Sequence, residues 1–103
     1  MSDFEKAQKN LRNDLIVIFV LELLLTILFL IYSGDVNIFT IVFVVLSFIG
    51  IFLAKAGSRG AGIIGIIFGI LMLITILSGD IIDFMLGLFL LIHSIKYNKL
   101  SKK

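Results

Sequence analysis

The chain of 103 residues has no cysteine, no proline and no tryptophan, and it has a single histidine. Without cysteine it can form no disulfide, offer no thiol chemistry and accept no palmitoyl group. A lone histidine builds neither a metal-binding cluster nor a catalytic triad, and the stretch GSRGAG at residues 57–62 lacks the lysine of a phosphate-binding loop. We therefore expect a protein that is not an enzyme and that uses no cofactor and no metal.

Charged residues are also scarce, and apolar residues take their place. The chain is 16% charged and 60% hydrophobic, with a mean hydropathy of +1.21, whereas a soluble domain is about a quarter charged and about half apolar. The apolar residues fall in long blocks without a helical period, so they leave no polar face to meet water. Residues 39–54 show none of the alternation that a transmembrane barrel strand needs. The sequence predicts an all-α membrane protein.

Four apolar blocks are separated by short polar or glycine-rich stretches. Each block has about 15 to 19 residues, or about 23 to 28 Å of helix, which is enough to cross the hydrocarbon core. Because the connections are short, consecutive helices should be antiparallel neighbours and form two hairpins. The predicted transmembrane helices are residues 15–32, 36–54, 61–77 and 81–95, within one domain of residues 15–95.

A charged segment flanks this domain at each end. Residues 1–14 can form an amphipathic helix with Phe4, Ala7 and Leu11 on one stripe, and we expect this helix to lie in the membrane interface. Residues 96–103 form a basic tail that should contact anionic lipid headgroups.

The placement of the basic residues predicts the orientation of the four helices. All nine fall on one side of the predicted membrane: Lys6, Lys9, Arg12, Lys55, Arg59, Lys96, Lys99, Lys102 and Lys103. Asp35, Asp80 and Asp83 fall on the other side. Under the positive-inside rule both termini are cytoplasmic, in a multi-pass protein of the cell membrane. The basic residues then determine topology and bind lipid headgroups, and no nucleic-acid partner is expected.

The two outer connections have similar sequences. SGDVNIF at residues 33–39 and SGDIIDF at residues 78–84 share four of seven positions. One interpretation is an internal repeat, with two hairpins related by a pseudo-twofold axis along the membrane normal. The other is shared turn chemistry, since glycine accepts positive φ and aspartate caps the next helix. The two interpretations are compatible.

Small residues recur every four positions along the third predicted helix. The ridge consists of Gly57, Ala61, Gly65 and Gly69. In lipid such a ridge lets two helix backbones approach closely enough for van der Waals packing. We expect it to pack either on the fourth helix at Gly87 or on a second copy of the chain in a homo-oligomer.

Glu22 is a charged residue near the middle of the first predicted transmembrane helix. An ionised carboxylate facing lipid at that depth is costly, so Glu22 should face the protein interior, be protonated, or both. Thr26 shares its helix face, Ser47 lies at a similar depth in the second helix, and His93 lies nearer the cytoplasmic side. These four residues form the predicted proton and cation site.

Two roles for Glu22 stay open. It can exchange protons with a cation while His93 relays protons to the cytosol. Alternatively, protonated Glu22 donates a hydrogen bond between helices that fixes their packing, worth about 1 kcal/mol. Only Thr26, Thr40 and Thr75 continue the polar residues toward the outer face, so the sequence does not predict a continuous pore.

The chain resembles the small multidrug resistance family. The resemblance consists of four short apolar helices in about a hundred residues, a glutamate in the first of them, Thr26 four residues later, and Gly34 after the helix. It implies that Glu22 binds protons and cationic drugs in turn, and that two subunits insert in opposite orientations.

From the residues themselves we expect a small, non-enzymatic membrane protein. It would act through helix packing as an accessory, regulatory or immunity-type partner of itself or of a larger membrane protein, with the lipid bilayer around it. The alternative is a proton-coupled transporter of small cations or drugs that uses Glu22. A holin-like pore former is a third possibility.

Overall fold

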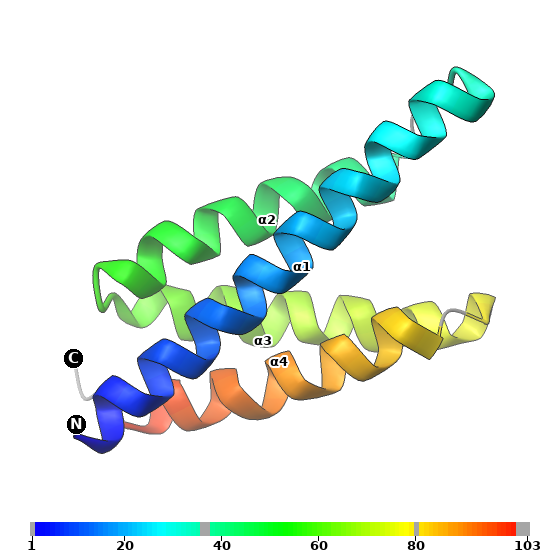
Figure 1. The fold of residues 1–103 in the computed structure, drawn as a ribbon. Helices are drawn as coiled ribbons and strands as arrows, with labels where there is room; N and C mark the ends of the chain where they lie inside the picture. Colours follow the sequence, from blue (N-terminus) through cyan, green and yellow to red (C-terminus); the bar gives the residue numbers. More distant parts are fainter. Residues whose placement is uncertain (1, 36–37, 80, 101–103) are drawn as a thin grey trace.

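The computed structural model describes residues 2–35, 38–79 and 81–100. These residues form α1 (Asp3–Ser33), α2 (Ile38–Lys55), α3 (Arg59–Ile74), the short 3₁₀ helix η1 (Thr75–Ser78) and α4 (Ile81–Leu100), drawn in Figure 1. Three residues discussed above, Asp80, Lys102 and Lys103, lie outside the described residues.

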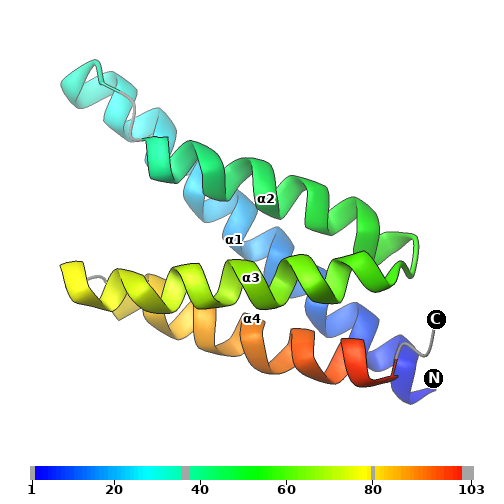
Figure 2. The same ribbon diagram turned by 180° about the vertical axis from the view of Figure 1, so that it is seen from behind.

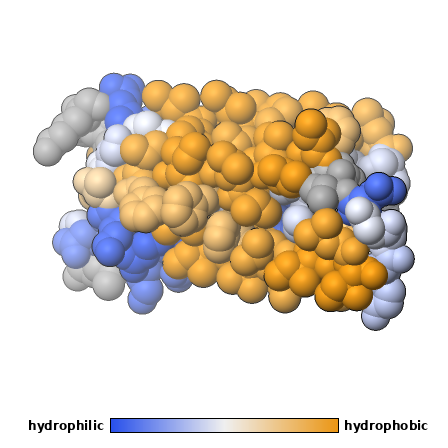
Figure 3. Space-filling model, turned by 90° about the horizontal axis from the view of Figure 1, so that it is seen from above, coloured by the Kyte–Doolittle hydropathy of each residue, from blue (hydrophilic) through white to orange (hydrophobic). Residues whose placement is uncertain are grey.

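The described residues form four helices that are long and apolar enough to cross a membrane. Large apolar side chains on these helices are mostly exposed, including Ile31, Leu24 and Phe52. Figure 3 shows them as an apolar belt between two hydrophilic ends of the molecule. Such a surface is stable against lipid and not against water, so the prediction of an all-α, multi-pass membrane protein is confirmed.

The N-terminal segment differs from the prediction. Residues 3–14 do not form a helix of their own, because they are the first part of α1, which runs without a break from Asp3 to Ser33. Its stripe is buried in the bundle, with Ala7 2% exposed and Leu11 fully buried. Ser2 begins α1 as its N-cap by accepting a hydrogen bond from the Glu5 N–H. The 31 residues of α1 span about 46 Å, which exceeds the thickness of the hydrocarbon core.

The C-terminal segment is helical over residues 96–100. α4 continues past residue 95 to Leu100, through part of the predicted basic tail. Tyr97 is fully buried, its ring lies 5.2 Å from that of Phe4, and its hydroxyl donates to the Ser58 carbonyl oxygen at 2.7 Å. The bundle therefore extends beyond the apolar part of the chain at the end that carries both termini.

The four helices are arranged as two closely packed pairs. α1 lies beside α2 and α3 lies beside α4, while α1 also packs on α4 and α2 on α3. The N-terminus and the end of α4 lie at the same end of the molecule, and the two pairs splay apart toward the other end (Figures 1 and 2).

α1, α2 and α4 each bury one narrow stripe whose members are three or four residues apart, and α3 buries a slightly wider face. This spacing is that of a left-handed coiled-coil seam, in which side chains of one helix pack between those of the next. The buried residues are 7, 11, 15, 18 and 22 of α1; 40, 43, 47, 50 and 54 of α2; 61, 62, 65, 68, 69 and 72 of α3; and 83, 87, 90, 94 and 97 of α4.

Glycines on α3 and α4 allow these two helices to approach very closely. A Cβ atom on Gly69 would lie 3.1 Å from the Gly87 carbonyl oxygen, and one on Gly87 would lie 2.6 Å from Met72 Cβ. Gly65 faces the buried Ser94, and Ala61 is fully buried on the same ridge. The two backbones touch at Gly69 and Gly87, as a small-residue ridge in lipid allows.

Gly57 does not belong to this ridge, contrary to the sequence interpretation. It precedes α3 in the turn after α2, and its φ of +72° is in the left-handed region that favours glycine. Its N–H donates to the Ala54 carbonyl oxygen at 3.1 Å. Gly57 therefore ends α2, and the Gln8 side chain of α1 lies beside it, with Nε2 at 3.7 Å from the position that a Cβ would take.

We predict that Gly65→Ala destabilises the bundle. The added Cβ would lie 2.0 Å from Ser94 Oγ and 2.8 Å from Ser94 Cβ, so α3 and α4 would have to move apart at a cost of about 1 to 3 kcal/mol. The free energy of unfolding in detergent micelles measures this effect. Gly60→Ala is the control, since its nearest atoms would be at 3.4 and 3.5 Å. Equal stability of the two variants would contradict the close contact.

Candidate functional site

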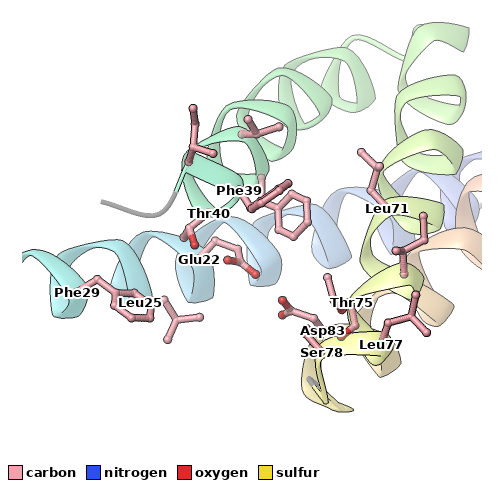
Figure 4. A pocket seen from close by; sticks show the side chains of 14 residues that line it. Glu22, Leu25, Phe29, Phe39, Thr40, Leu71, Thr75, Leu77, Ser78 and Asp83 are labelled. Atoms are coloured by element: carbon pink, nitrogen blue, oxygen red, sulfur yellow. Dashed lines mark hydrogen bonds between the residues drawn. The ribbon is translucent and has the colours of Figure 1, made fainter. Parts of the chain in front are cut away.

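A pocket of about 900 Å³ lies between the two helix pairs, at their splayed end. Every helix contributes to its wall, and most of the lining is apolar. The lining residues are Glu22, Leu25, Phe29, Ile38, Phe39, Thr40, Val42, Phe43, Leu71, Ile74, Thr75, Leu77, Ser78 and Asp83 (Figure 4). A mostly apolar cavity of this size with a few convergent polar groups is typical of a small-molecule site.

Glu22 lies on the α1 wall of the pocket. Its side chain is 2% exposed, on the same buried stripe as Leu15 and Ile18, and it points into the pocket in Figure 4. Thr26, predicted to share the site, does not line the pocket: its hydroxyl donates to the Glu22 carbonyl oxygen at 2.9 Å within α1. Glu22 therefore faces the protein interior, as the cost of a carboxylate in lipid requires.

Asp83 lies on the opposite wall and was not predicted as a site residue. It is in the first turn of α4, is 6% exposed, and points toward Glu22 across the pocket (Figure 4). A signal for its burial was present in the sequence. Asp83 continues the spacing of three or four residues that runs through Gly87, Leu90 and Ser94 on α4.

Three hydroxyl side chains complete the polar part of the wall. Thr40 is 7% exposed at the start of α2, and Thr75 and Ser78 come from the 3₁₀ helix. The Thr75 hydroxyl donates to the Met72 carbonyl oxygen, and the Ser78 hydroxyl donates to the Thr75 carbonyl oxygen. Among the described lining residues, none is Lys, Arg or His, so the pocket carries only acidic ionisable groups.

The structure does not bring the predicted polar path together. Ser47 is fully buried but donates to the Val44 carbonyl oxygen at 2.9 Å and does not line the pocket. His93 lies ten residues from Asp83, about 15 Å along α4 toward the termini. Its Nδ1 contacts a carboxylate oxygen of Asp14 on α1. Hydropathy predicts the depth of a residue in the membrane but not the direction in which its side chain points. The prediction therefore grouped residues by their depth, although their side chains face different neighbours.

The contact between Asp14 and His93 is one of several polar contacts that tie the helices together at the end with both termini. Gln8 Nε2 on α1 donates to the Ala54 carbonyl oxygen of α2 at 2.6 Å. The Tyr97 hydroxyl on α4 bonds to Ser58 before α3, as described above. We call these three contacts the terminal clamp. Two of them lie within the pairs, α1 to α2 and α4 to the start of α3, and the contact of Asp14 with His93 joins one pair to the other.

The basic residues predicted to set topology lie near this clamped end. Lys6, Lys9, Lys55, Lys96 and Lys99 are exposed. Arg12 is partly buried, and the exposed Arg59 donates from Nε to Asn98 Oδ1 at 3.4 Å. Charged side chains at this end are in position to reach lipid headgroups, while the pocket lies at the opposite end.

We predict that Asp14→Asn and His93→Gln each lower the free energy of unfolding by about 1 to 3 kcal/mol, because each leaves a partly buried polar partner without its charged contact. The double variant should be little less stable than the less stable of the two single variants, since both substitutions break the same interaction. A double-mutant cycle in detergent micelles measures the coupling. Asp35→Asn, at an exposed position, is the control. Strictly additive losses would show that the pair contributes nothing.

Comparisons of the chain with protein-family models, with curated proteins and with solved structures found no match. The function must therefore be inferred from the geometry of the pocket itself.

Proposed function

We propose that this protein is a membrane carrier that binds a small apolar cation in the pocket and exchanges it for a proton at Glu22. The observation that carries this proposal is a cavity of about 900 Å³ with mostly apolar walls and an almost fully buried carboxyl group directed into it. The volume is within the usual range for pockets that bind small molecules. The activity is binding and movement of an ion, without an enzymatic step.

The chemistry of the lining favours a cation with apolar groups. Apolar side chains such as Leu25, Phe43 and Leu71 bury the apolar surface of a ligand. They do so for ligands of different shapes. A carboxylate in this environment is costly unless a positive charge or a proton neutralises it. A proton and a cation therefore compete for the same group, and this competition is the basis of proton-coupled exchange.

We also propose that the chain forms two antiparallel hairpins in the cell membrane with both termini in the cytoplasm. The shared end of the N-terminus and α4 in Figure 1 supports this topology, and so does the gathering of basic residues at that end. The pocket then lies in the outer half of the membrane. The resemblance to the small multidrug resistance family fits the same assignment of Glu22 and motivates a multidrug-type cation as the first substrate to try.

The proposal predicts that Glu22→Gln abolishes proton-driven cation flux. Protein reconstituted in liposomes under an imposed pH gradient should move tetraphenylphosphonium, and the amide should stop this movement because it cannot alternate between a proton and a cation. Asp35→Asn is the matched control, since it removes an exposed carboxylate outside the pocket lining. Circular dichroism establishes that each variant remains helical. Flux that persists in a folded Glu22→Gln variant would contradict the proposal.

A second function, that of a non-enzymatic accessory or immunity-type partner, is favoured by one observation. The pocket lies between splayed helix pairs, and its rim residues Phe39 and Leu77 are 70% and 86% exposed. Such a cleft offers apolar surface to the transmembrane helix of another protein. Absence of flux in the wild type, together with a purely structural effect of Glu22→Gln, would make this the better proposal.

A further inference from the structure

We propose that Asp83 is the second ligand of the cation, and that one proton or one monovalent cation bridges Glu22 and Asp83 across the pocket. This inference rests on the proposed cation-binding function and adds to it a second binding residue and a charge for the substrate.

The positions of the two carboxyl groups are the first support. Glu22 extends from α1 and Asp83 from α4, so they belong to different helix pairs, and Figure 4 shows them pointing toward one another. Both are nearly fully buried, at 2% and 6% exposure. The other acidic residues that the structure describes are placed differently. Asp14 contacts His93 near the clamped end, and the remaining ones, Asp3, Glu5 and Asp35, are exposed.

The charge of the lining then determines which ligand fits. The walls contributed by α2, α3 and the 3₁₀ helix carry hydroxyl and apolar side chains, and among the described lining residues Glu22 and Asp83 are the ionisable ones. Two carboxylates that face one another in an apolar cavity do not both ionise readily, and such pairs hold one proton between them. A pair that holds one proton has a charge of −1. A single monovalent cation can replace that proton and leave the charge of the site unchanged at −1, so the exchange is electrically balanced.

Bridging also has a mechanical consequence. The two helix pairs are joined near one end by the contact of Asp14 with His93 and by the ring contact of Phe4 with Tyr97, and they diverge at the end that contains the pocket. A shared proton or a cation attracts both carboxyl groups and draws α1 toward α4, whereas two ionised groups repel and separate the pairs. Occupancy of the bridge therefore shifts the equilibrium between a closed and an open outer end.

Asp83 has a competing structural explanation that the test must separate. An acidic residue in the first turn of a helix interacts favourably with the partial positive charge of the helix N-terminus. In that role its replacement would lower the stability of α4 and leave the affinity for a cation unchanged. Cation affinity, and not stability alone, is therefore the readout.

The experiment is a double-mutant cycle of tetraphenylphosphonium binding, measured by equilibrium dialysis with the full chain in lipid nanodiscs. We expect Glu22→Gln and Asp83→Asn each to weaken binding by at least about tenfold. The variant with both changes should bind no more weakly than the single variants, because either change breaks the bridge. Asp83→Glu, which keeps the charge, should retain most of the affinity, and Asp35→Asn should bind like the wild type.

Proton release gives a second measurement that needs only the wild-type protein. A pH indicator in weak buffer should report about one proton released for each tetraphenylphosphonium ion bound. Release of none or of two would overturn the shared-proton bridge, even if an Asp83 variant fails to fold.

The binding data distinguish a failure of the bridge between Glu22 and Asp83 from a failure of the proposed function. If Asp83→Asn binds like the wild type while Glu22→Gln does not, Asp83 only stabilises α4, and the proposed function survives without it. If the losses of the two single variants multiply in the double variant, the carboxyl groups act independently and no bridge exists. If the wild type binds no cation, both the bridge and the proposed function are wrong.

Discussion

The close contact between α3 and α4 is the constraint on which the rest of the bundle depends. Lipid supplies no hydrophobic force between helices, so they associate only where their surfaces fit at van der Waals distance. Gly69 and Gly87 bring the two backbones together, and Gly65 leaves just enough room for Ser94. A similar fit appears between α1 and α2, where the Leu15 side chain lies over Gly50. The molecule is therefore built from two pairs, each of which packs internally at glycine.

The pocket follows from the way in which these pairs are joined. Polar contacts gather at the end with both termini, where Gln8, Tyr97 and the pair of Asp14 and His93 tie the helices together. Toward the other end the two pairs diverge (Figures 1 and 2). The buried stripes continue into that region, so their polar members face the space between the pairs.

The sequence predicts the helices and the burial of Glu22 well, because both follow from the cost of placing polar groups in lipid. It predicts the rotation of each helix poorly, since apolar residues cover all sides and hide the stripe that packs. The signal was nonetheless present in α1, where Ala7 and Leu11 have the same spacing as Leu15 and Ile18. The contact of His93 with Asp14 had no such signal, because 79 residues separate the two and only the assembled bundle brings them together.

The arrangement of charge gives a physical reason for keeping two carboxyl groups in such an apolar place. If their only task were to hold helices together, apolar side chains of similar volume would do so at lower cost, as replacements of buried ionic groups show. The contact of Asp14 with His93 lies at the end with the termini, where both side chains are partly exposed and the desolvation cost is smaller. Glu22 and Asp83 have almost no such exposure. In the proposed function, a proton and a cation in turn occupy the space between them and offset the cost of burying their charge.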